Sequence, residues 1–291
     1  MQTSRVLWRA IGVLVAVALA TSAASAQTVD GRLKIIRDTA TLRIAYRTDS
    51  RPFSFLDAQR RPSGYTIELC ERVAKTLERE LGLPALGITW VPVDTRTRFE
   101  AIVDGAADME CGSTTISLTR MKTVDFSTMV FVDSTGVLVK SDAGINGFDA
   151  MGGRKIGIIA GSTNGRAIRE QLQRRKLEAT LVEFRDRQDG LAALTLGAID
   201  GFATDKLVLT AMAQAANARD FALLPDDLSF EPFAIMLPRG DWAFRLAVNT
   251  GLAQVFRSGD VIAIYSKYFD SVAWRPSVWL GAVFAFGGLP E

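Results

Sequence analysis

The chain has 291 residues, of which 48% are hydrophobic and 23% charged, with 34 basic side chains against 32 acidic ones. It is long enough for two globular units of ordinary size. It contains no histidine, which excludes a Ser-His-Asp triad and ordinary imidazole acid–base chemistry. Because it has no CxxC motif either, we expect no transition-metal site and no cofactor.

Residues 1–26 have the pattern of a secretory signal peptide. Arg5 and Arg9 supply a positive start, an apolar core runs from Ile11 to Ala20, and Ala24-Ser25-Ala26 is a small-x-small cleavage site. The core is too short to span a bilayer comfortably. We therefore expect cleavage after Ala26 and export to the periplasm. The two arginines equal the excess of positive charge, so the remaining chain is neutral, which argues against a nucleic-acid partner.

Apolar strand-like runs then alternate with amphipathic helical runs, as is typical of α/β proteins. We expect strands over Leu42–Tyr46 and Ile88–Val93, with a helix over Tyr65–Leu81 between them. Thr97-Arg-Phe-Glu100 has the pattern of a capping box that opens a further helix. This places Arg98 in a first helical turn, where a cation opposes the helix dipole.

The stretch from Asp108 to Arg120, DMECGSTTISLTR, has the pattern of a ligand-binding turn. We expect Val103 to Met109 to form a strand that leads into three hydroxyl residues, Ser113 to Thr115. Ser117 is expected to cap a short helix that has Arg120 in its first turn, at a cost of roughly 0.3–1 kcal/mol unless the arginine meets an anion. Backbone N–H groups, hydroxyls and a guanidinium together predict a carboxylate receptor. The alternative is a capped turn with a solvated arginine.

Residues 154–224 predict a second, smaller α/β unit. The extended stretch from Met129 to Lys140 is long enough to connect it to the first unit. A strand over Lys155–Ile159 is followed by a glycine-rich turn, Ala160 to Gly165, and a helix. The turn is not a phosphate loop, because no Lys-Ser/Thr pair follows Gly165. It still offers N–H groups and two hydroxyls, those of Ser162 and Thr163.

A weak internal repeat relates the two units. Phe99 to Asp108 resembles Leu191 to Asp200, and in each copy a helix ends at Gly-Ala and a strand begins at Asp. The repeat puts Ser113 and Asp205 at equivalent strand ends. Because ligands of open parallel sheets bind beyond the carboxyl ends of the strands, we expect these two ends to face each other across a cleft.

The C-terminal part predicts a return strand over Phe233–Leu237 and helices over Trp242–Phe256 and Val261–Tyr268. The apolar tail from Trp274 to Pro290 is too short to span a membrane.

The two cysteines are Cys70 and Cys111. An exported protein meets an oxidising compartment, in which a pair can be bridged. A bridge over this loop of about 40 residues would be worth roughly 4 kcal/mol. Both the bridged and the free state are compatible with the sequence.

Three segments carry a family resemblance: Gly64-Tyr-Thr-Ile-Glu-Leu69, the string Asp108 to Thr115, and Arg120-x-x-x-Val-Asp-Phe-Ser127. Together they resemble the family 3 polar amino-acid-binding proteins of bacterial ABC importers, in particular the glutamate/aspartate-binding members, from about Leu33 to Phe269. The resemblance implies the type II periplasmic-binding-protein fold, an α/β fold in which two hinge strands join two lobes and the second lobe is inserted in the first. On this basis lobe 1 comprises residues 27–133 and 231–291, and lobe 2 residues 134–230.

The resemblance also implies which residues hold the α-groups of the ligand. Arg120 matches the arginine that binds the α-carboxylate, helped by Ser162 or Thr163 from the second lobe. Ser113 and Thr115 match acceptors near the α-ammonium group, and Asp205 matches its carboxylate partner.

The side-chain carboxylate of glutamate or aspartate is assigned by the resemblance to Arg47, Thr95 and Arg98. A dicarboxylic zwitterion needs two cationic pockets and one anionic pocket, and these arginines with Arg120 and Asp205 supply them. Two positions depart from the family. Arg187 stands where acidic-amino-acid binders often have a histidine, and Ile159 stands where a threonine can contribute.

The expected function is that of a monomeric binding protein, not an enzyme, which captures glutamate or aspartate by lobe closure and delivers it to a membrane ABC permease. One alternative is a periplasmic dehydratase-like enzyme of the same fold, because arginines and a carboxylate in a cleft can do acid–base chemistry. Formation of product from prephenate or arogenate would identify it. Another alternative is a ligand sensor that signals to a membrane receptor.

Overall fold

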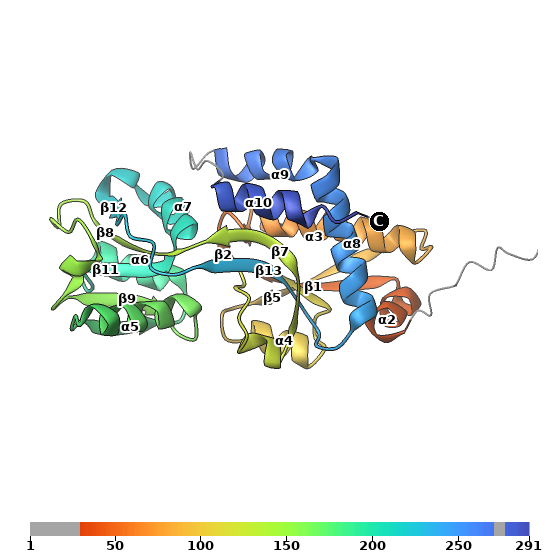
Figure 1. Cartoon of the computed structure of the whole chain (residues 1–291), viewed down its shortest axis with the longest axis horizontal. Helices are drawn as coiled ribbons and strands as arrows, with labels where there is room; N and C mark the ends of the chain where they lie inside the picture. Colours follow the sequence, from red (N-terminus) through yellow and green to blue (C-terminus); the bar gives the residue numbers. More distant parts are fainter. Residues whose placement is uncertain (1–29, 271–276, 291) are drawn as a thin grey trace, which may run out of the picture. The chain divides into compact units, whose positions relative to one another are not determined.

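A computed structural model of the chain describes residues 30–270 and 277–290 (Figure 1). The predicted signal peptide, residues 1–26, lies outside the described residues. A first group of strands comprises β1 Thr41–Arg47, β5 Gly87–Val93, β6 Met109–Cys111, β7 Asp125–Asp133 and β13 Glu231–Leu237. Its helices are α2 Gly31–Thr39, α3 Tyr65–Glu80, α4 Arg98–Val103, the 3-10 helix η1 Arg120–Lys122, α8 Trp242–Ser258, α9 Asp260–Phe269 and α10 Val278–Gly287.

A second group of strands comprises β8 Thr135–Lys140, β9 Lys155–Ile159, β10 Thr180–Phe184, β11 Gly201–Asp205 and β12 Phe221–Leu223. Its helices are η2 Phe148–Met151, α5 Thr163–Arg175, α6 Arg187–Thr195, α7 Lys206–Ala216 and η3 Ala218–Asp220. Three short strands form a small separate sheet: β2 Asp49–Ser50, β3 Ser54–Leu56 and β4 Pro62–Ser63.

The two large groups form two five-stranded sheets. The first sheet has the order β5-β1-β6-β13-β7, and the second sheet has the order β10-β9-β11-β8-β12. In the first sheet β1 is parallel to β5 and β6, and β13 is antiparallel to β6 and β7. In the second, β9 is parallel to β10 and β11, and β8 is antiparallel to β11 and β12. The parallel strands of each sheet therefore carry the βα turns in which the predicted site residues stand.

The chain crosses between the sheets twice. It leaves the first sheet at the end of β7 and enters the second at β8, and it returns between β12 and β13. β7 and β13 lie side by side as an antiparallel pair, with Asp133 opposite Glu231 (Figure 1). The second group of strands is therefore inserted in the first. The lobe boundaries at residues 133/134 and 230/231 stay a prediction.

Aromatic rings fill much of the core of the first group. The ring of Phe53 is 4.8 Å from that of Phe131 and 5.1 Å from that of Phe233, in edge-to-face contacts. Phe269 of α9 stacks on Phe131 at 5.1 Å. Such pairs are worth about 0.5–1.5 kcal/mol beyond the area that they bury. This packing anchors the segment before α3 and the two crossing strands to one core.

Two local predictions are wrong. Val103 does not begin a strand but ends α4, because Gly105 adopts a φ of 70°, which glycine tolerates and which terminates the helix; β6 begins only at Met109. Thr97 does not cap α4 with its side chain. Instead the Asp94 carboxylate accepts the N–H groups of Arg96 and Thr97 at 2.8 and 2.9 Å, because an ionised acceptor forms stronger hydrogen bonds than a hydroxyl.

Cys70 and Cys111 form a disulfide, with their Cα atoms 6.5 Å apart. The bridge joins the buried face of α3 to the last residue of β6. The question that the sequence left open is thereby answered. The bridge holds the strand end that leads directly into Gly112 and Ser113.

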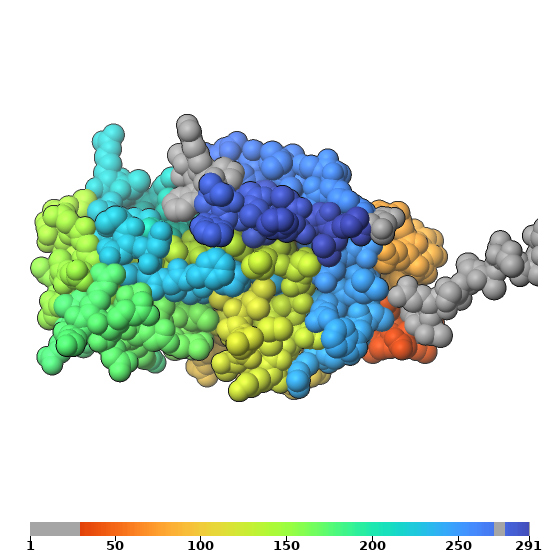
Figure 2. All heavy atoms as spheres, viewed as in Figure 1, coloured from red at the N-terminus to blue at the C-terminus, as the bar shows by residue number. Residues whose placement is uncertain are grey.

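Val278–Gly287 of the apolar tail form α10, which packs on β7 and α8 through Leu280, Val283 and Phe284. Its other side is exposed, with 72% of Trp279 and 79% of Phe286 accessible. Figure 2 shows this helix in dark blue, on the face turned to the viewer. Among residues 30–270 and 277–290, no helix combines the length and apolarity needed to cross a membrane.

Candidate functional site

The ends of strands from both sheets meet at one polar junction. Ser113 follows β6 of the first sheet, and Asp205 is the last residue of β11 of the second. The Ser113 hydroxyl donates to Asp205 Oδ2 at 3.3 Å. On its other oxygen, Asp205 accepts a hydrogen bond of 2.9 Å from the Asn164 amide. The two strand ends that the internal repeat relates are thus in contact.

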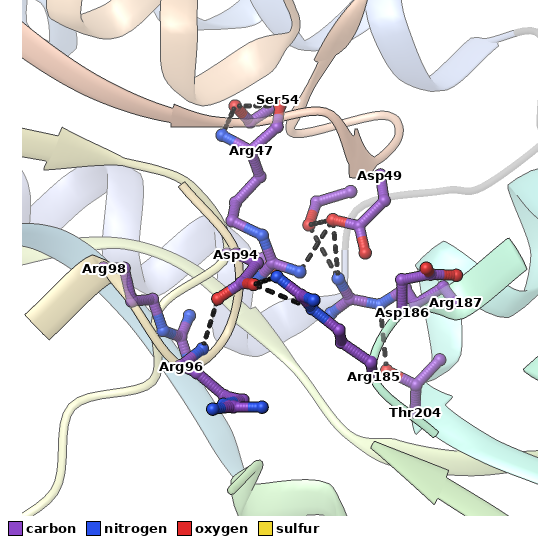
Figure 3. Close-up of polar contacts among 12 residues, drawn as sticks. Arg47, Asp49, Ser54, Asp94, Arg96, Arg98, Arg185, Asp186, Arg187 and Thr204 are labelled. Atoms are coloured by element: carbon purple, nitrogen blue, oxygen red, sulfur yellow. Dashed lines mark hydrogen bonds and ion pairs between the residues drawn. The ribbon is translucent and has the colours of Figure 1, made fainter. Parts of the chain in front are cut away.

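A chain of alternating charges crosses the junction (Figure 3). Arg47, at the end of β1, donates from Nη2 to Asp49 Oδ1 at 2.7 Å. Arg187, the first residue of α6, donates to the same oxygen at 3.3 Å and to Asp205 Oδ2 at 3.1 Å. Both arginines are buried, with Arg47 1% exposed. The predicted site residues Arg47, Arg187 and Asp205 are therefore linked through an acid, Asp49, that was not predicted.

Burial and neighbouring charges shift the pKa values of these side chains in opposite directions. Burial lowers the pKa of Arg47, and the charge of Asp49 partly offsets this effect. Burial by itself would raise the pKa of Asp49, but the neighbouring guanidiniums of Arg187 and Arg47 outweigh it and hold the pKa below its usual range. Asp49 is therefore anionic at neutral pH.

Arg98, the first residue of α4, is held by a hydroxyl and not by a direct ion pair. It is 4% exposed, and its Nη1 donates to Thr114 Oγ1 at 2.7 Å. Thr114 in turn donates to Glu110 Oε2 at 2.6 Å. Burial, and then the charge of Arg120, lowers the pKa of Arg98 to about 9, so it stays cationic at neutral pH. Glu110 is fully buried in β6 and was not predicted as a site residue. The sequence signal that could have identified Glu110 is its charge, since the rest of this strand is apolar.

Four buried polar atoms of this region make no hydrogen bond within the described part of the chain. They are Arg47 Nε, Thr95 Oγ1, Arg98 Nε and Glu110 Oε1. A buried polar group without a partner costs about 1–3 kcal/mol, so such groups are rare and mark places where a ligand or solvent supplies the bond. Three of the four belong to residues predicted to receive the side-chain carboxylate.

Arg120 stands at the start of η1, and its backbone N–H donates to the Ser117 hydroxyl at 3.2 Å. The predicted first-turn position is confirmed, although the helix is a 3-10 helix. Its Nη1 donates to the Thr115 carbonyl oxygen at 2.7 Å, and its guanidinium carbon is 5.2 Å from the ring centre of Phe99. Burial lowers the pKa of Arg120, and the charge of Glu231 opposes this shift. The guanidinium is thus placed at the edge of the junction.

Glu231, the first residue of β13, connects hydroxyls of both sheets. Its Oε2 accepts from Thr115 Oγ1 at 2.5 Å and from Thr163 Oγ1 at 2.8 Å. The Ser162 hydroxyl is used elsewhere: it accepts from the Gly165 N–H at 3.0 Å and donates to the Ile159 carbonyl at 2.7 Å, which caps α5. Of the two predicted helpers of Arg120, Thr163 therefore has its hydroxyl at the junction.

A more exposed ion pair also joins the two groups of strands (Figure 3). Arg185 lies 3.2 Å from Asp94, with 72% of the arginine side chain exposed. Burial raises the pKa of Asp94, but the backbone N–H groups of Thr97 and Arg96 outweigh it and lower the pKa to about 2. Within the described ranges, no three His, Cys, Asp or Glu side chains are arranged to hold a metal ion.

Comparison with known sequences adds three findings. The sequence pattern of the bacterial extracellular solute-binding proteins, family 3, matches residues 42–271. The L-glutamate/L-aspartate-binding protein of Pseudomonas aeruginosa is 32% identical over 254 residues, which cover 87% of this chain and 84% of that protein. The glutamate/aspartate import solute-binding protein of Escherichia coli is 26% identical over 87% of this chain and 86% of its own.

Among solved structures, an ancestral amino acid-binding protein described as a precursor of cyclohexadienyl dehydratase is similar. It is 26% identical with a TM-score of 0.73, over 82% of this chain and all of that one. Together with the insertion of the second sheet in the first, this likeness confirms the predicted two-lobed type II fold.

Proposed function

Because this chain belongs to the bacterial extracellular solute-binding proteins, family 3, we propose that it captures glutamate or aspartate and delivers it to a membrane ABC permease. The ligand class is suggested by the relatives named for these two amino acids. The proposal includes export to the periplasm after cleavage behind Ala26, a monomeric state, and capture by closure of two lobes. The unpartnered donors of the junction are the observation that carries it.

The donors without partners suit a ligand side-chain carboxylate. Arg47 Nε, Arg98 Nε and Thr95 Oγ1 are buried and free to donate. Arg47 and Arg187 form ion pairs with Asp49, whereas Arg98 is held by the Thr114 hydroxyl and has no direct ion pair. The side-chain carboxylate of glutamate or aspartate would give Arg98 the anion that it lacks. A neutral amide would leave buried cations unpaired, so discrimination comes in part from a penalty against the wrong ligand.

The other side of the junction suits the α-groups. Arg120 offers donors for the α-carboxylate, and the hydroxyls of Thr115 and Thr163 would join it by turning away from Glu231, to which they donate in this structure. Asp205 and Ser113 offer acceptors for the α-ammonium group. The Arg187 guanidinium already contacts Asp205, so the ammonium group would share this carboxylate with it.

Isothermal titration calorimetry of the mature protein against the twenty amino acids tests the proposal. We expect glutamate or aspartate to bind at least about a hundredfold tighter than glutamine, a difference near 2.7 kcal/mol. Arg98→Gln should reduce that ratio by weakening the acidic ligand. Arg96→Gln is the matched control, because Arg96 is an exposed arginine two residues away. Equal affinity for glutamate and glutamine in the wild type would contradict the acidic specificity.

An enzymatic role is the second candidate, because the similar ancestral protein is described as a precursor of a dehydratase. The buried Glu110 has one carboxylate oxygen without a partner, which is the kind of group that acid–base catalysis needs. We favour binding without catalysis, since the relatives are named as binding proteins. Incubation with prephenate or arogenate, followed by NMR, should show no product. A sensor that signals to a membrane receptor would share the binding site, and neighbouring reading frames would distinguish it.

A further inference from the structure

Asp49 is a resident carboxylate within the proposed ligand site. It lies in β2, and 8% of its side chain is exposed. Three donors converge on its Oδ1: Arg47 Nη2 at 2.7 Å, Arg187 Nη1 at 3.3 Å and the Ser50 hydroxyl at 3.4 Å. Two guanidiniums, one from β1 and one from α6, and a hydroxyl around one carboxylate oxygen are the kind of receptor that an acidic ligand requires.

The position of Asp49 divides the donors of Arg47 into two sets. The terminal Nη2 is bonded to Asp49, whereas Nε makes no hydrogen bond within the described residues. All three nitrogens of Arg187 also donate within the protein: Nε to Thr204, Nη1 to Ser50 and Asp49, and Nη2 to Asp205. A ligand carboxylate is thereby directed to the side of Arg98 and away from Arg187.

We propose that Asp49 is a specificity-determining residue that neutralises Arg47 and Arg187 and so limits the site to a single, moderately bound side-chain carboxylate. This inference rests on the proposed function. In a buried site, a fixed negative charge beside the ligand carboxylate weakens acidic ligands and hardly affects neutral ones, since Coulomb energies are large at low dielectric.

A purely structural role for Asp49 predicts a different result. Asp49 also joins β2 to α6, so its loss would loosen the contact between the two groups of strands. In that case every ligand would lose affinity, acidic and neutral alike. A role of its charge predicts that only acidic ligands gain affinity when the charge is removed. The ratio of glutamate to glutamine affinity therefore separates the two roles.

The test is calorimetric titration of the mature wild type and Asp49→Asn with glutamate, aspartate, glutamine and asparagine. Asparagine keeps an acceptor oxygen for both arginines and removes only the charge. We expect Asp49→Asn to bind glutamate at least about tenfold tighter and glutamine within about threefold of wild type. Asp38→Asn is the control, because it removes the same charge from the exposed surface of α2 and should bind as wild type does.

The outcomes separate the inference from the proposed function. If the wild type binds an acidic ligand and Asp49→Asn binds it no more tightly, the inference alone is overturned. If the wild type binds only other amino acids and Asp49→Asn gains acidic ligands, the inference holds and the proposed function is wrong. If neither protein binds acidic ligands, both fail. Asp49→Ser, which is smaller and also neutral, replaces Asp49→Asn if the latter does not give a cooperative thermal transition.

Discussion

The hydroxyls of Thr115 and Thr163 lie 3.3 Å apart, although one belongs to the first group of elements and the other begins a helix of the second. Both donate to the same carboxylate oxygen of Glu231, at the start of the returning strand. A group that bonds to both hydroxyls therefore couples the two sheets. The ligand α-carboxylate beside Arg120 would couple the sheets in the same way on taking both hydroxyls from Glu231, which would relate ligand binding to the contact between the lobes.

Arg120→Ala should lower the affinity for the acidic ligand by about a hundred- to five-thousandfold. The ligand α-carboxylate would remain buried without its cation, which costs about 3–5 kcal/mol. Calorimetry measures the loss, and Lys122→Ala in the same 3-10 helix is the control, because Lys122 is exposed. A tenfold effect or less in a folded Arg120→Ala protein would mean that the α-carboxylate binds elsewhere.

Gly112→Ala should damage the site because the junction leaves no room for a side chain there. An added Cβ would come within 2.3 Å of Glu110 Oε1 and 3.1 Å of Arg47 Cγ. Overpacking of this kind costs about 1–3 kcal/mol, and here it displaces two charged side chains. We expect a lower melting temperature and at least about tenfold weaker binding.

Gly281→Ala is the matched control for this substitution. No atom lies within 4 Å of a Cβ at that position in α10, so alanine should be neutral or slightly stabilising. Unchanged binding by Gly112→Ala would show that Glu110 and Arg47 can move apart freely.

The sequence predicted helices and strands well where their hydrophobic periodicity lies within one short segment. Three elements were predicted within about two residues of their bounds: the strand that ends at Arg47, the helix that begins at Tyr65 and the return strand that ends at Leu237. The error at Val103 has a local cause, because an apolar helix end resembles a strand when glycine follows it. The internal repeat placed Ser113 and Asp205 at equivalent strand ends, and the structure brings them into contact.

Two acids of the junction, Asp49 and Glu231, were beyond such reasoning. Asp49 contacts Arg187 over a separation of 138 residues, and Glu231 contacts Thr115 over 116. Which carboxylate neutralises which arginine depends on the packing of one sheet against the other, and no local pattern records it. The choice between Ser162 and Thr163 also needed structure, since both can cap a helix.

Removal of the disulfide should lower the free energy of unfolding by about 4 kcal/mol, because the bridge closes a loop over a separation of 41 residues. Denaturant unfolding of the wild type with and without reductant measures this difference. The double variant Cys70→Ala/Cys111→Ala should unfold at a lower denaturant concentration than the oxidised wild type, and reductant should not change its unfolding midpoint. Equal unfolding midpoints for fully reduced and oxidised wild type would contradict the prediction.

The stability contributed by Asp133 should decrease as the pH rises. Burial, and then the charge of Asp205, raises the pKa of Asp133 well above its usual value. The folded state then holds a proton that the unfolded state releases near pH 3.9, so the free energy of unfolding falls with rising pH above that value. We expect Asp133→Asn to show a shallower decline between pH 4 and 7 than wild type, measured by denaturant unfolding. Asp142→Asn, on the exposed surface, should leave the slope unchanged.

Ser162 and Thr163 are neighbours, and we expect their substitution to affect different properties. The Ser162 hydroxyl accepts from the Gly165 N–H and donates to the Ile159 carbonyl, so both of its bonds are local to the start of α5. Ser162→Ala should therefore cost about 0.5–2 kcal/mol of stability, as the loss of a helix cap does. Ligand affinity should stay within about threefold of wild type.

Thr163→Val should lower the ligand affinity, unlike Ser162→Ala. Valine keeps the shape of threonine but loses the hydroxyl that reaches Glu231 at 2.8 Å and Thr115 at 3.3 Å. A hydrogen bond from this hydroxyl to the ligand α-carboxylate would be worth about 1.5–3 kcal/mol, so we expect affinity to fall by about ten- to a hundredfold. The loss of the bond to Glu231 should also lower the stability. Calorimetry and denaturant unfolding of both variants measure the two properties together. If Ser162→Ala weakens binding as much as Thr163→Val does, the second lobe holds the α-carboxylate through Ser162 after all, and its cap must open when the ligand binds.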